Sequence, residues 1–275
     1  LLRGSGHGTV VRVRAAGVNR ISLGVQSFHP AKLQLLERDH RPEDVAGIFP
    51  HIRARFPSIS LDMICGVPGE TLDAWRADLQ SALALAPDHL SIYCLTFEKG
   101  AAFWGRLMRG HLTQTDEETQ RAMLETAWDQ LAQQGWDHYE ISNFARPGHR
   151  CRHNAVYWKG EPYFAIGPGA ARYVDGRRET NHRSTTTYIR RVLSGQSPVA
   201  DRDELEPAER AREMLVFRLR MIEGITRREF RQRTGFDLDQ LAGKPLRKFA
   251  RLGLVEDSAD RIRLTREGLL VSDCL

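Results

Sequence analysis

Apolar residues in the first half of the chain form short unbroken runs, with segments of helical spacing between them. Runs of this kind predict buried strands, and they lie at residues 21–25, 58–65 (SISLDMIC) and 89–95 (HLSIYCL). Apolar residues at steps of three and four predict helices, and these lie at residues 30–38, 42–52 and 71–84. Strand–helix–strand units about 30 residues long indicate an α/β fold with a parallel sheet, open or barrel-like.

The second half of the chain has a different pattern. A long helix is expected at 116–134, and short irregular strands are expected in a segment rich in aromatic residues, Gly and Pro at 136–173. Further helices are expected at 184–193, 207–221, 226–233 and 238–252, with a hairpin made of 254–256 and 261–264. Because this last part has a winged-helix-like outline, we expect two domains, residues 1–195 and 196–275.

The composition of the chain excludes some classes of protein. The chain has 275 residues, of which 41% are hydrophobic and 27% charged, as is usual for a globular protein with a core. No apolar run reaches the roughly 18 residues of a membrane span, and the first residues lack the apolar region of a secretory signal. The chain lacks an initiator Met, which favours a fragment. The net charge of +5 is dispersed, so by itself it does not predict nucleic-acid binding.

Cysteine spacing excludes two classes of small protein. Cys65, Cys94, Cys151 and Cys274 lie far apart and form no CxxC pair. This pattern excludes a small disulfide scaffold and a local zinc knuckle, and it favours a reducing, cytoplasmic location.

Polar residues at the ends of the predicted strands are candidates for ligand binding, since the carboxyl ends of parallel strands meet ligands. Gln26 follows the first strand, and Asp62 and Tyr93 lie within the next two. A carboxylate in so apolar a strand needs a partner. Asp62 is equally well explained by a structural role, as a loop cap or an arginine partner. For Gln26, an amide that closes a turn is the commoner explanation.

Two further motifs carry possible chemistry. The turn Gly66-Val67-Pro68-Gly69-Glu70-Thr71 opens a helix, and its N–H groups are suited to an anion or a carboxylate, although most such turns only connect elements. His153 lies near Cys151 and beside Tyr157 and Trp158. Imidazole and thiolate both ligate heme iron, and flat aromatic rings suit a planar macrocycle. A structural histidine is the commoner explanation of an isolated residue of this kind.

Five sequence blocks in order resemble those of the oxygen-independent coproporphyrinogen III oxidase family of radical SAM proteins. They are residues 17–28 (GVNRISLGVQSF), 61–71 (LDMICGVPGET), 89–96 (HLSIYCLT), 139–145 (YEISNFA) and 151–158 (CRHNAVYW). The second is similar to the family block DLIYGLPGQT. HNAVYW fits HNxxYW, which points to the HemW, heme chaperone-like branch. The resemblance implies a partial (β/α) TIM-like radical SAM barrel with a small, mainly α, winged-helix-like C-terminal domain.

The resemblance also implies cofactors and site residues. By position, Gln26, Arg38 and Asp62 match family residues that contact S-adenosyl-L-methionine (SAM), and His153 matches the heme contact and candidate iron ligand. Arginine can pair with the SAM carboxylate and aspartate can accept hydrogen bonds from its hydroxyls. The family's [4Fe–4S] cluster is held by a CxxxCxxC triad that this sequence lacks. The resemblance therefore implies an N-terminally truncated chain without the cluster ligands.

Three functions remain open at this point. The first is a SAM- and heme-binding chaperone-like protein whose partners are heme or porphyrin and a heme-accepting protein, and not nucleic acid. The second is a coproporphyrinogen III oxidase that performs oxidative decarboxylation. The third is a non-enzymatic module that binds protein or nucleic acid through the winged-helix-like tail. If half of a barrel is missing, strand 21–25 is expected at an exposed sheet edge unless residues 1–16 cover it.

Overall fold

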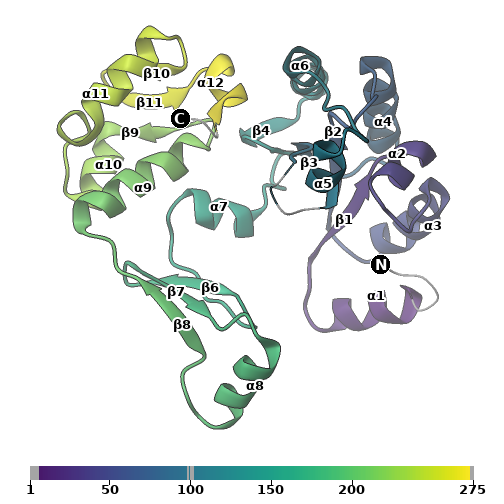
Figure 1. Cartoon of the computed structure of the whole chain (residues 1–275), viewed down its shortest axis with the longest axis horizontal. Helices are drawn as coiled ribbons and strands as arrows, with labels where there is room; N and C mark the ends of the chain where they lie inside the picture. The colour runs from purple at the N-terminus through teal and green to yellow at the C-terminus, as the bar shows by residue number, and fades with distance from the viewer. Residues whose placement is uncertain (1–5, 98, 100–101, 273–275) are drawn as a thin grey trace. The chain divides into compact units, whose positions relative to one another are not determined.

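The computed structural model describes the chain except residues 1–5, 98, 100–101 and 273–275 (Figure 1). Cys274 therefore lies outside the described residues. Contacts divide the chain into two compact units, Leu1–Arg150 and Cys151–Leu275. This division groups residues 151–195 with the C-terminal part of the chain. The domain boundary expected at 195/196 lies inside the second of these units, and it stays a prediction.

A five-stranded sheet in the order β1-β2-β3-β5-β4 forms the centre of the first unit. Its strands are β1 (Arg20–Gln26), β2 (Ser58–Cys65), β3 (His89–Cys94), β4 (Asp137–Glu140) and β5 (Asn143–Ala145). β1, β2 and β3 are parallel, which confirms the three predicted strands, whereas β5 runs antiparallel to β3 and β4 antiparallel to β5. Within the described part of the chain β1 pairs with β2 alone, so its predicted edge position is confirmed.

The first unit also contains helices, some of which pack against this sheet. They are α1 (Gly6–Ala15), α2 (Pro30–Leu35), α3 (Pro42–Arg53), α4 (Leu72–Ala84), α5 (Ala102–Met108) and α6 (Glu117–Gln133). Ile59, Leu61 and Met63 are alternate residues of β2, and all are fully buried. Since α3 and α6 both contact β2, these side chains form the core between sheet and helices. The Trp75 indole N–H on α4 donates to the carbonyl of Met123 on α6 at 2.8 Å, which joins the two helices.

The first part of the second unit consists of a short helix and a small sheet. Its elements are α7 (Arg152–Trp158), β6 (Ala171–Val174), β7 (Arg177–Asn181), α8 (Thr185–Leu193) and β8 (Val199–Asp203), with the strands antiparallel in the order β6-β7-β8. The short strands expected within residues 136–173 are present as β4, β5 and β6, and α7 is a further element that the sequence did not predict. This helix has only seven residues, too few for a clear helical period, and Trp158 packs it against Phe217 of α9 at 6.3 Å between ring centroids.

The remaining elements of this unit have a helical and winged outline. They are α9 (Pro207–Leu219), β9 (Ile225–Thr226), α10 (Arg227–Thr234), α11 (Leu238–Arg251), β10 (Val255–Asp257), β11 (Arg261–Leu264) and α12 (Arg266–Leu270). β10 and β11 form the predicted hairpin, and β9 adds a third strand. Phe230, Leu246 and Ile262 lie in the core. Gly224 has φ +62°, and a Cβ there would lie 2.0 Å from the carbonyl oxygen of Ile262, so the turn requires glycine.

Across the part of the chain that the structure describes, none of the helices has the length and apolar character needed to cross a bilayer.

Candidate functional site

The face of β1, β2 and β3 opposite the helices carries polar side chains. Asp62 of β2 pairs in register with Ser91 of β3, and the Ser22 hydroxyl of β1 donates to Asp62 Oδ1 at 2.7 Å. Ser22 is exposed, and Tyr93, two residues after Ser91, is 44% exposed. The face is therefore polar and accessible around Asp62.

Asp62 is only partly desolvated. Burial raises the pKa of the Asp62 carboxyl above its ordinary value, while hydrogen bonds from Ser22 and Ser91 and the positive charge of Arg20 oppose the shift. Among the described residues Asp62 forms no ion pair with an arginine, and the Arg20 guanidinium donates instead to the Ser58 hydroxyl at 3.0 Å. A carboxylate held by a hydroxyl, with no cation bound to it, remains able to accept hydrogen bonds from a ligand.

His89, the first residue of β3, lies on the same face of the sheet. Its side chain is buried, with Nδ1 at 2.8 Å from the Ser60 hydroxyl and Nε2 at 2.9 Å from the Tyr139 hydroxyl. Burial, then the charges of Arg20 and His149, lower the pKa of His89 to about 3. His89 is therefore neutral at physiological pH and supports the sheet.

The YEISN part of the fourth motif supports the same face from β4 and β5. The Ser91 hydroxyl donates to Asn143 Oδ1 at 2.6 Å, and the Asn143 amide in turn donates to the Glu140 carboxylate. This motif thus completes the hydrogen bonds of the inner strands.

Gln26 ends β1 in a left-handed conformation with φ +64°. Its side chain lies over Gly24, because a Cβ at Gly24 would come within 2.9 Å of Gln26 Nε2. Gly24 alternates with Ser22 along the strand, so this places the Gln26 amide on the face that carries Asp62. The His40 ring donates from Nε2 to the carbonyl oxygen of Val25 at 2.9 Å and fixes the backbone beside Gln26.

Arg38, the third predicted SAM contact, lies in the loop between α2 and α3. It follows α2, and its side chain is exposed. In the described residues no hydrogen bond or ion pair joins it to Gln26 or Asp62. The structure thus brings two of the three residues to neighbouring strands and leaves Arg38 in a surface loop.

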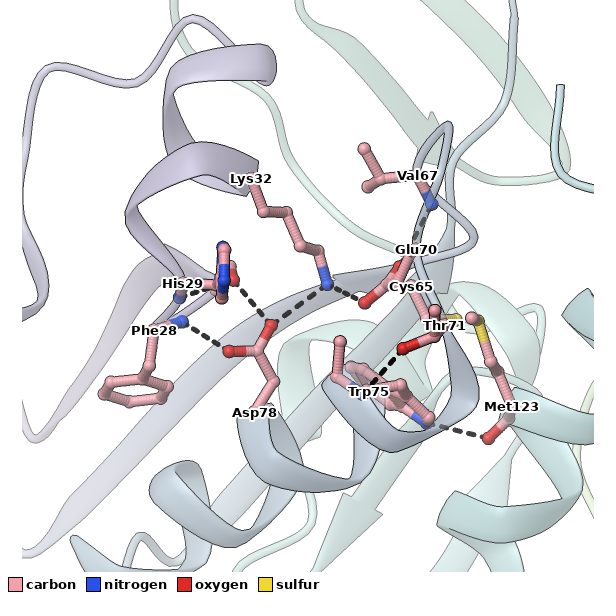
Figure 2. A network of polar contacts seen from close by, with 12 residues as sticks. Phe28, His29, Lys32, Cys65, Val67, Glu70, Thr71, Trp75, Asp78 and Met123 are labelled. Carbon is pink, nitrogen blue, oxygen red and sulfur yellow. Dashed lines mark hydrogen bonds and ion pairs between the residues drawn. The ribbon is translucent and has the colours of Figure 1, made fainter. Parts of the chain in front are cut away.

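A buried ionic cluster, absent from the sequence-based expectations, lies at the carboxyl ends of β1 and β2 (Figure 2). Lys32 of α2 is 7% exposed, and its ammonium group contacts both Glu70 and Asp78, the latter at 3.1 Å. The ammonium also lies 5.3 Å from the ring centroid of Trp75. We call Lys32, Glu70 and Asp78 the rim cluster.

The rim cluster ties together the two loops that leave the sheet. Asp78 accepts from the Ser27 hydroxyl at 2.5 Å and from the Phe28 N–H at 2.7 Å, after β1. Glu70 accepts from the Val67 N–H at 3.1 Å, after β2. The GVPGET turn is thus occupied by its own carboxylate, which makes an external anion unnecessary there (Figure 2).

The described residues do not fit a [4Fe–4S] cluster. They contain no group of three or more His, Cys, Asp or Glu side chains placed to hold a metal ion. Cys65 and Cys94 are adjacent, with 3.4 Å between their sulfur atoms, and Cys151 belongs to the second unit. A cluster of this kind needs several thiolates around one site, which the described residues do not supply.

His153 lies on the surface of the second unit. It is an exposed residue of α7, and its Nε2 is 3.1 Å from the Tyr157 hydroxyl. Tyr157 can reach the ring because side chains four apart on a helix are neighbours, whereas those of consecutive residues diverge. Cys151, the rival iron ligand, caps α7 and is buried.

A cavity of about 230 Å³ lies beside Tyr157. Three tyrosine rings line it in sequence, with centroids 4.6 Å apart for Tyr157 and Tyr163 and 6.2 Å apart for Tyr163 and Tyr173. Arg178, Arg210 and Met214 are also part of its wall. The His153 imidazole thus contacts an aromatic residue of the cavity wall, and the same wall carries cationic side chains.

Comparisons with known proteins show to which class of protein this chain is similar. The model of the radical SAM superfamily matches residues 8–82, and the model of the HemN C-terminal domain matches residues 205–271. Among solved structures, the radical SAM enzyme coproporphyrinogen III oxidase (HemN) of Escherichia coli aligns with a TM-score of 0.81 and 20% identity, over 98% of this chain and 66% of its own. The fold is thus a HemN-like radical SAM fold.

Relatives narrow this class further. The heme chaperone HemW of Bacillus subtilis is 34% identical over 95% of this chain and 69% of its own length. The heme chaperone HemW of Synechocystis is 37% identical over 76% of this chain and 52% of its own length. The chain belongs to the HemW family of radical SAM proteins, and it spans about half to two thirds of the length of these relatives.

Proposed function

We propose that this chain binds heme on its second unit, as a heme chaperone, with His153 as the residue that would ligate the iron. The observation that carries the proposal is the exposed His153 imidazole next to the tyrosine-lined cavity. Cys151 is buried at the start of α7, which favours the imidazole over the thiol. Bound heme supplies an iron atom that a neutral imidazole nitrogen can ligate.

The remaining groups around His153 have roles that follow from their chemistry. Tyr157 orients the ring through its hydroxyl, as hydrogen-bond partners of metal-binding histidines do. Arg210, in the cavity wall, offers a guanidinium group to the carboxylates of the porphyrin edge. Arg178 is already paired with Glu213 at 2.9 Å, so Arg210 is the better candidate.

A heme titration followed at the Soret band tests this proposal on the full chain. His153→Ala should abolish the Soret shift, whereas Cys151→Ala should leave it largely intact. His111→Ala removes an exposed histidine of the first unit and serves as the matched control. The opposite pattern for His153 and Cys151 would assign the iron to the thiolate, and unchanged spectra in both variants would return His153 to a structural role.

We further propose that the first unit has a residual SAM site at Asp62 and Gln26, with Arg38 contributing from its loop. The accessible Asp62 carboxylate and the neighbouring Gln26 amide support this assignment. Affinity should be weak, since the described residues offer no cluster to chelate the amino and carboxylate groups of SAM. Calorimetry should show weak binding that Asp62→Ala removes. Tight binding, or equal binding by Asp62→Ala, contradicts the assignment.

Two other functions are less well supported. An oxidase that decarboxylates coproporphyrinogen III is disfavoured by the HNAVYW motif and by relatives that are heme chaperones. Binding of nucleic acid by the winged-helix-like part is disfavoured because Arg227 is engaged by Asp239, at 2.7 Å, and by Asp257. As a chaperone, the chain would pass heme to a heme-accepting protein.

A further inference from the structure

Two thiols meet at the carboxyl ends of β2 and β3. Cys65 and Cys94 are the last residues of these strands and pair directly in register, and their sulfur atoms are 3.4 Å apart. Neighbouring strands lie about 4.8 Å apart. This spacing is within the range of Cα separations, about 4.4–6.8 Å, over which a disulfide forms. The pair therefore needs only side-chain rotation to close a disulfide.

The two thiols differ in exposure and acidity. Cys65 is fully buried, whereas Cys94 is partly exposed. The hydrogen bond with Cys94, and then burial, raise the pKa of Cys65, whereas the hydrogen bond from Cys65 lowers the pKa of Cys94. The more acidic thiol is thus also the one that a small oxidant can reach, as is typical of a reactive cysteine.

We propose that Cys65 and Cys94 form a peroxide-reactive thiol pair, in which Cys94 is the attacking thiol and Cys65 the resolving one. The Cys94 thiol first loses its proton to the solvent. The thiolate attacks the outer oxygen of a hydroperoxide, the O–O bond breaks, and the departing hydroxide or alkoxide takes up that proton from the solvent, which gives water or an alcohol. The Cys65 thiol then attacks the Cys94 sulfenic acid, which forms the disulfide and releases water. Each peroxide accepts two electrons from the pair, and a dithiol reductant reverses the reaction.

The position of the pair links this chemistry to the loop that follows. Gly66 comes next with φ +72°, and a Cβ there would lie 3.9 Å from the Cys94 sulfur and 3.2 Å from Cγ of Gln120. The same loop leads to Glu70 of the rim cluster (Figure 2). A disulfide would thus join the two strand ends beside the loop that carries Glu70.

Peptide mapping after exposure to hydrogen peroxide tests the proposal directly. Trypsin separates the two cysteines, since residues 56–76 contain Cys65 and residues 77–99 contain Cys94. Without reduction, the two peptides should appear as one linked species lighter by two hydrogens, and reduction should separate them. Cys151, a buried thiol of the second unit, is the internal control and should remain unmodified. If peroxide produces no linked species, or modifies Cys151 as fast as Cys94, the proposal is wrong.

Single variants test the order of the two steps. In Cys65→Ser, dimedone should trap a sulfenic acid on peptide 77–99, because no resolving thiol is present. In Cys94→Ser, Cys65 should stay reduced. A sulfenic acid on Cys65 in that variant would overturn the assigned order. Circular dichroism of both variants checks that they remain folded, and the linked species in the unaltered chain tests the pair without any substitution.

Discussion

At the scale of single residues, side-chain hydrogen bonds between neighbouring strands stabilise the polar face of the sheet in the first unit. Ser22 donates to Asp62, and Ser60 bonds to His89, in each case from one strand to the next. A buried polar group without a partner destabilises a fold by about 1–3 kcal/mol, so these hydroxyls allow the sheet to carry polar residues on this face. Two residues of this face titrate, Asp62 and His89. Burial raises the pKa of Asp62 and lowers the pKa of His89.

Replacement of Asp62 by Asn separates a binding role from a structural one. Because burial raises the pKa of Asp62, the fold disfavours its charged form at pH 7, and Asn keeps an acceptor for Ser22 without the charge. The free energy of unfolding of Asp62→Asn, measured by urea denaturation, should equal that of the unaltered chain or exceed it by up to about 1 kcal/mol. A clear loss of stability would instead make Asp62 a structural residue. Asp88→Asn, which weakens an ion pair with Arg53 at 2.7 Å, is the control and should lower stability.

His89 should make the fold less stable in acid. Its pKa is about 3 in the folded chain and 6.5 in the unfolded chain, so between these values the unfolded chain binds the extra proton. Stability therefore falls as the pH drops below about 6.5, by about 2 kcal/mol at pH 5 from this residue alone. Raised pKa values at Asp62 and Glu70 act in the opposite direction.

The effect of His89 is measured as the difference in stability loss between the His89→Gln variant and the unaltered chain. The contributions of Asp62 and Glu70 are the same in both chains and therefore cancel. Urea denaturation at pH 7.5 and pH 5 should show a smaller acid-induced loss for His89→Gln than for the unaltered chain, since Gln keeps hydrogen-bonding capacity toward Ser60 and Tyr139 but does not titrate. If the free energy of unfolding falls equally in the two chains between pH 7.5 and pH 5, the pKa of His89 is not lowered by the fold.

The candidate site residues were predicted from motif blocks, except Arg38, which was predicted from its position in the family resemblance. Gln26, Asp62 and His153 lie in quoted motif blocks, and their binding roles are still predictions. The rim cluster escaped prediction because Lys32 is 38 residues from Glu70 and 46 from Asp78 along the chain. The available signal was a lysine in a short helix of apolar spacing. A single sequence does not show which carboxylates meet it.

At the scale of elements, local periodicity was sufficient for most helices and strands and insufficient for their pairing. The parallel strands β1, β2 and β3 and the helix α4 follow directly from apolar spacing and from the cap at Thr71, whose hydroxyl accepts from the Ala74 N–H at 3.2 Å. The antiparallel addition of β5 and β4 depends on contacts between distant segments. Strands of three and four residues carry too little pattern to predict their partners.

The rim cluster should contribute strongly to the free energy of unfolding, because it joins the loops that follow β1 and β2. Lys32→Met keeps the length of the side chain but leaves Glu70 and Asp78 buried with no cation between them. Removing one partner of a buried pair typically costs about 3–5 kcal/mol, and a loss of that size is expected in urea denaturation at pH 7.5. Burial already raises the pKa of Glu70, so the loss should become smaller as the pH is lowered, because protonation of this carboxyl relieves the repulsion.

Two further variants control the experiment on Lys32. Lys244→Met removes an exposed lysine of α11 and should change the free energy of unfolding by no more than about 0.5 kcal/mol. Lys32→Met combined with Glu70→Gln should recover part of the lost stability, because one of the two unpaired charges is gone. If Lys32→Met is as stable as Lys244→Met, the cluster contributes little to the fold.

At the scale of the whole chain, the two units contain different candidate sites. The residual SAM site and the thiol pair belong to Leu1–Arg150, and the His153 site belongs to Cys151–Leu275. Each unit has its own buried core, with Trp75 and Leu79 in the first and Phe230 and Ile262 in the second. Because a ligand stabilises the structure to which it binds, each ligand should stabilise mainly its own unit.

Hydrogen exchange of the full chain tests this separation for heme. On heme addition, amides of α7 and of the segments that line the neighbouring cavity, in β6, β7 and α9, should exchange more slowly, because opening of these segments would require heme to dissociate. Amides of β1, β2 and β3 should exchange as before. His153→Ala should remove the protection in the second unit, whereas His111→Ala should keep it. Protection spread equally over both units, or retained by His153→Ala, would indicate non-specific adsorption of heme and not a site at His153.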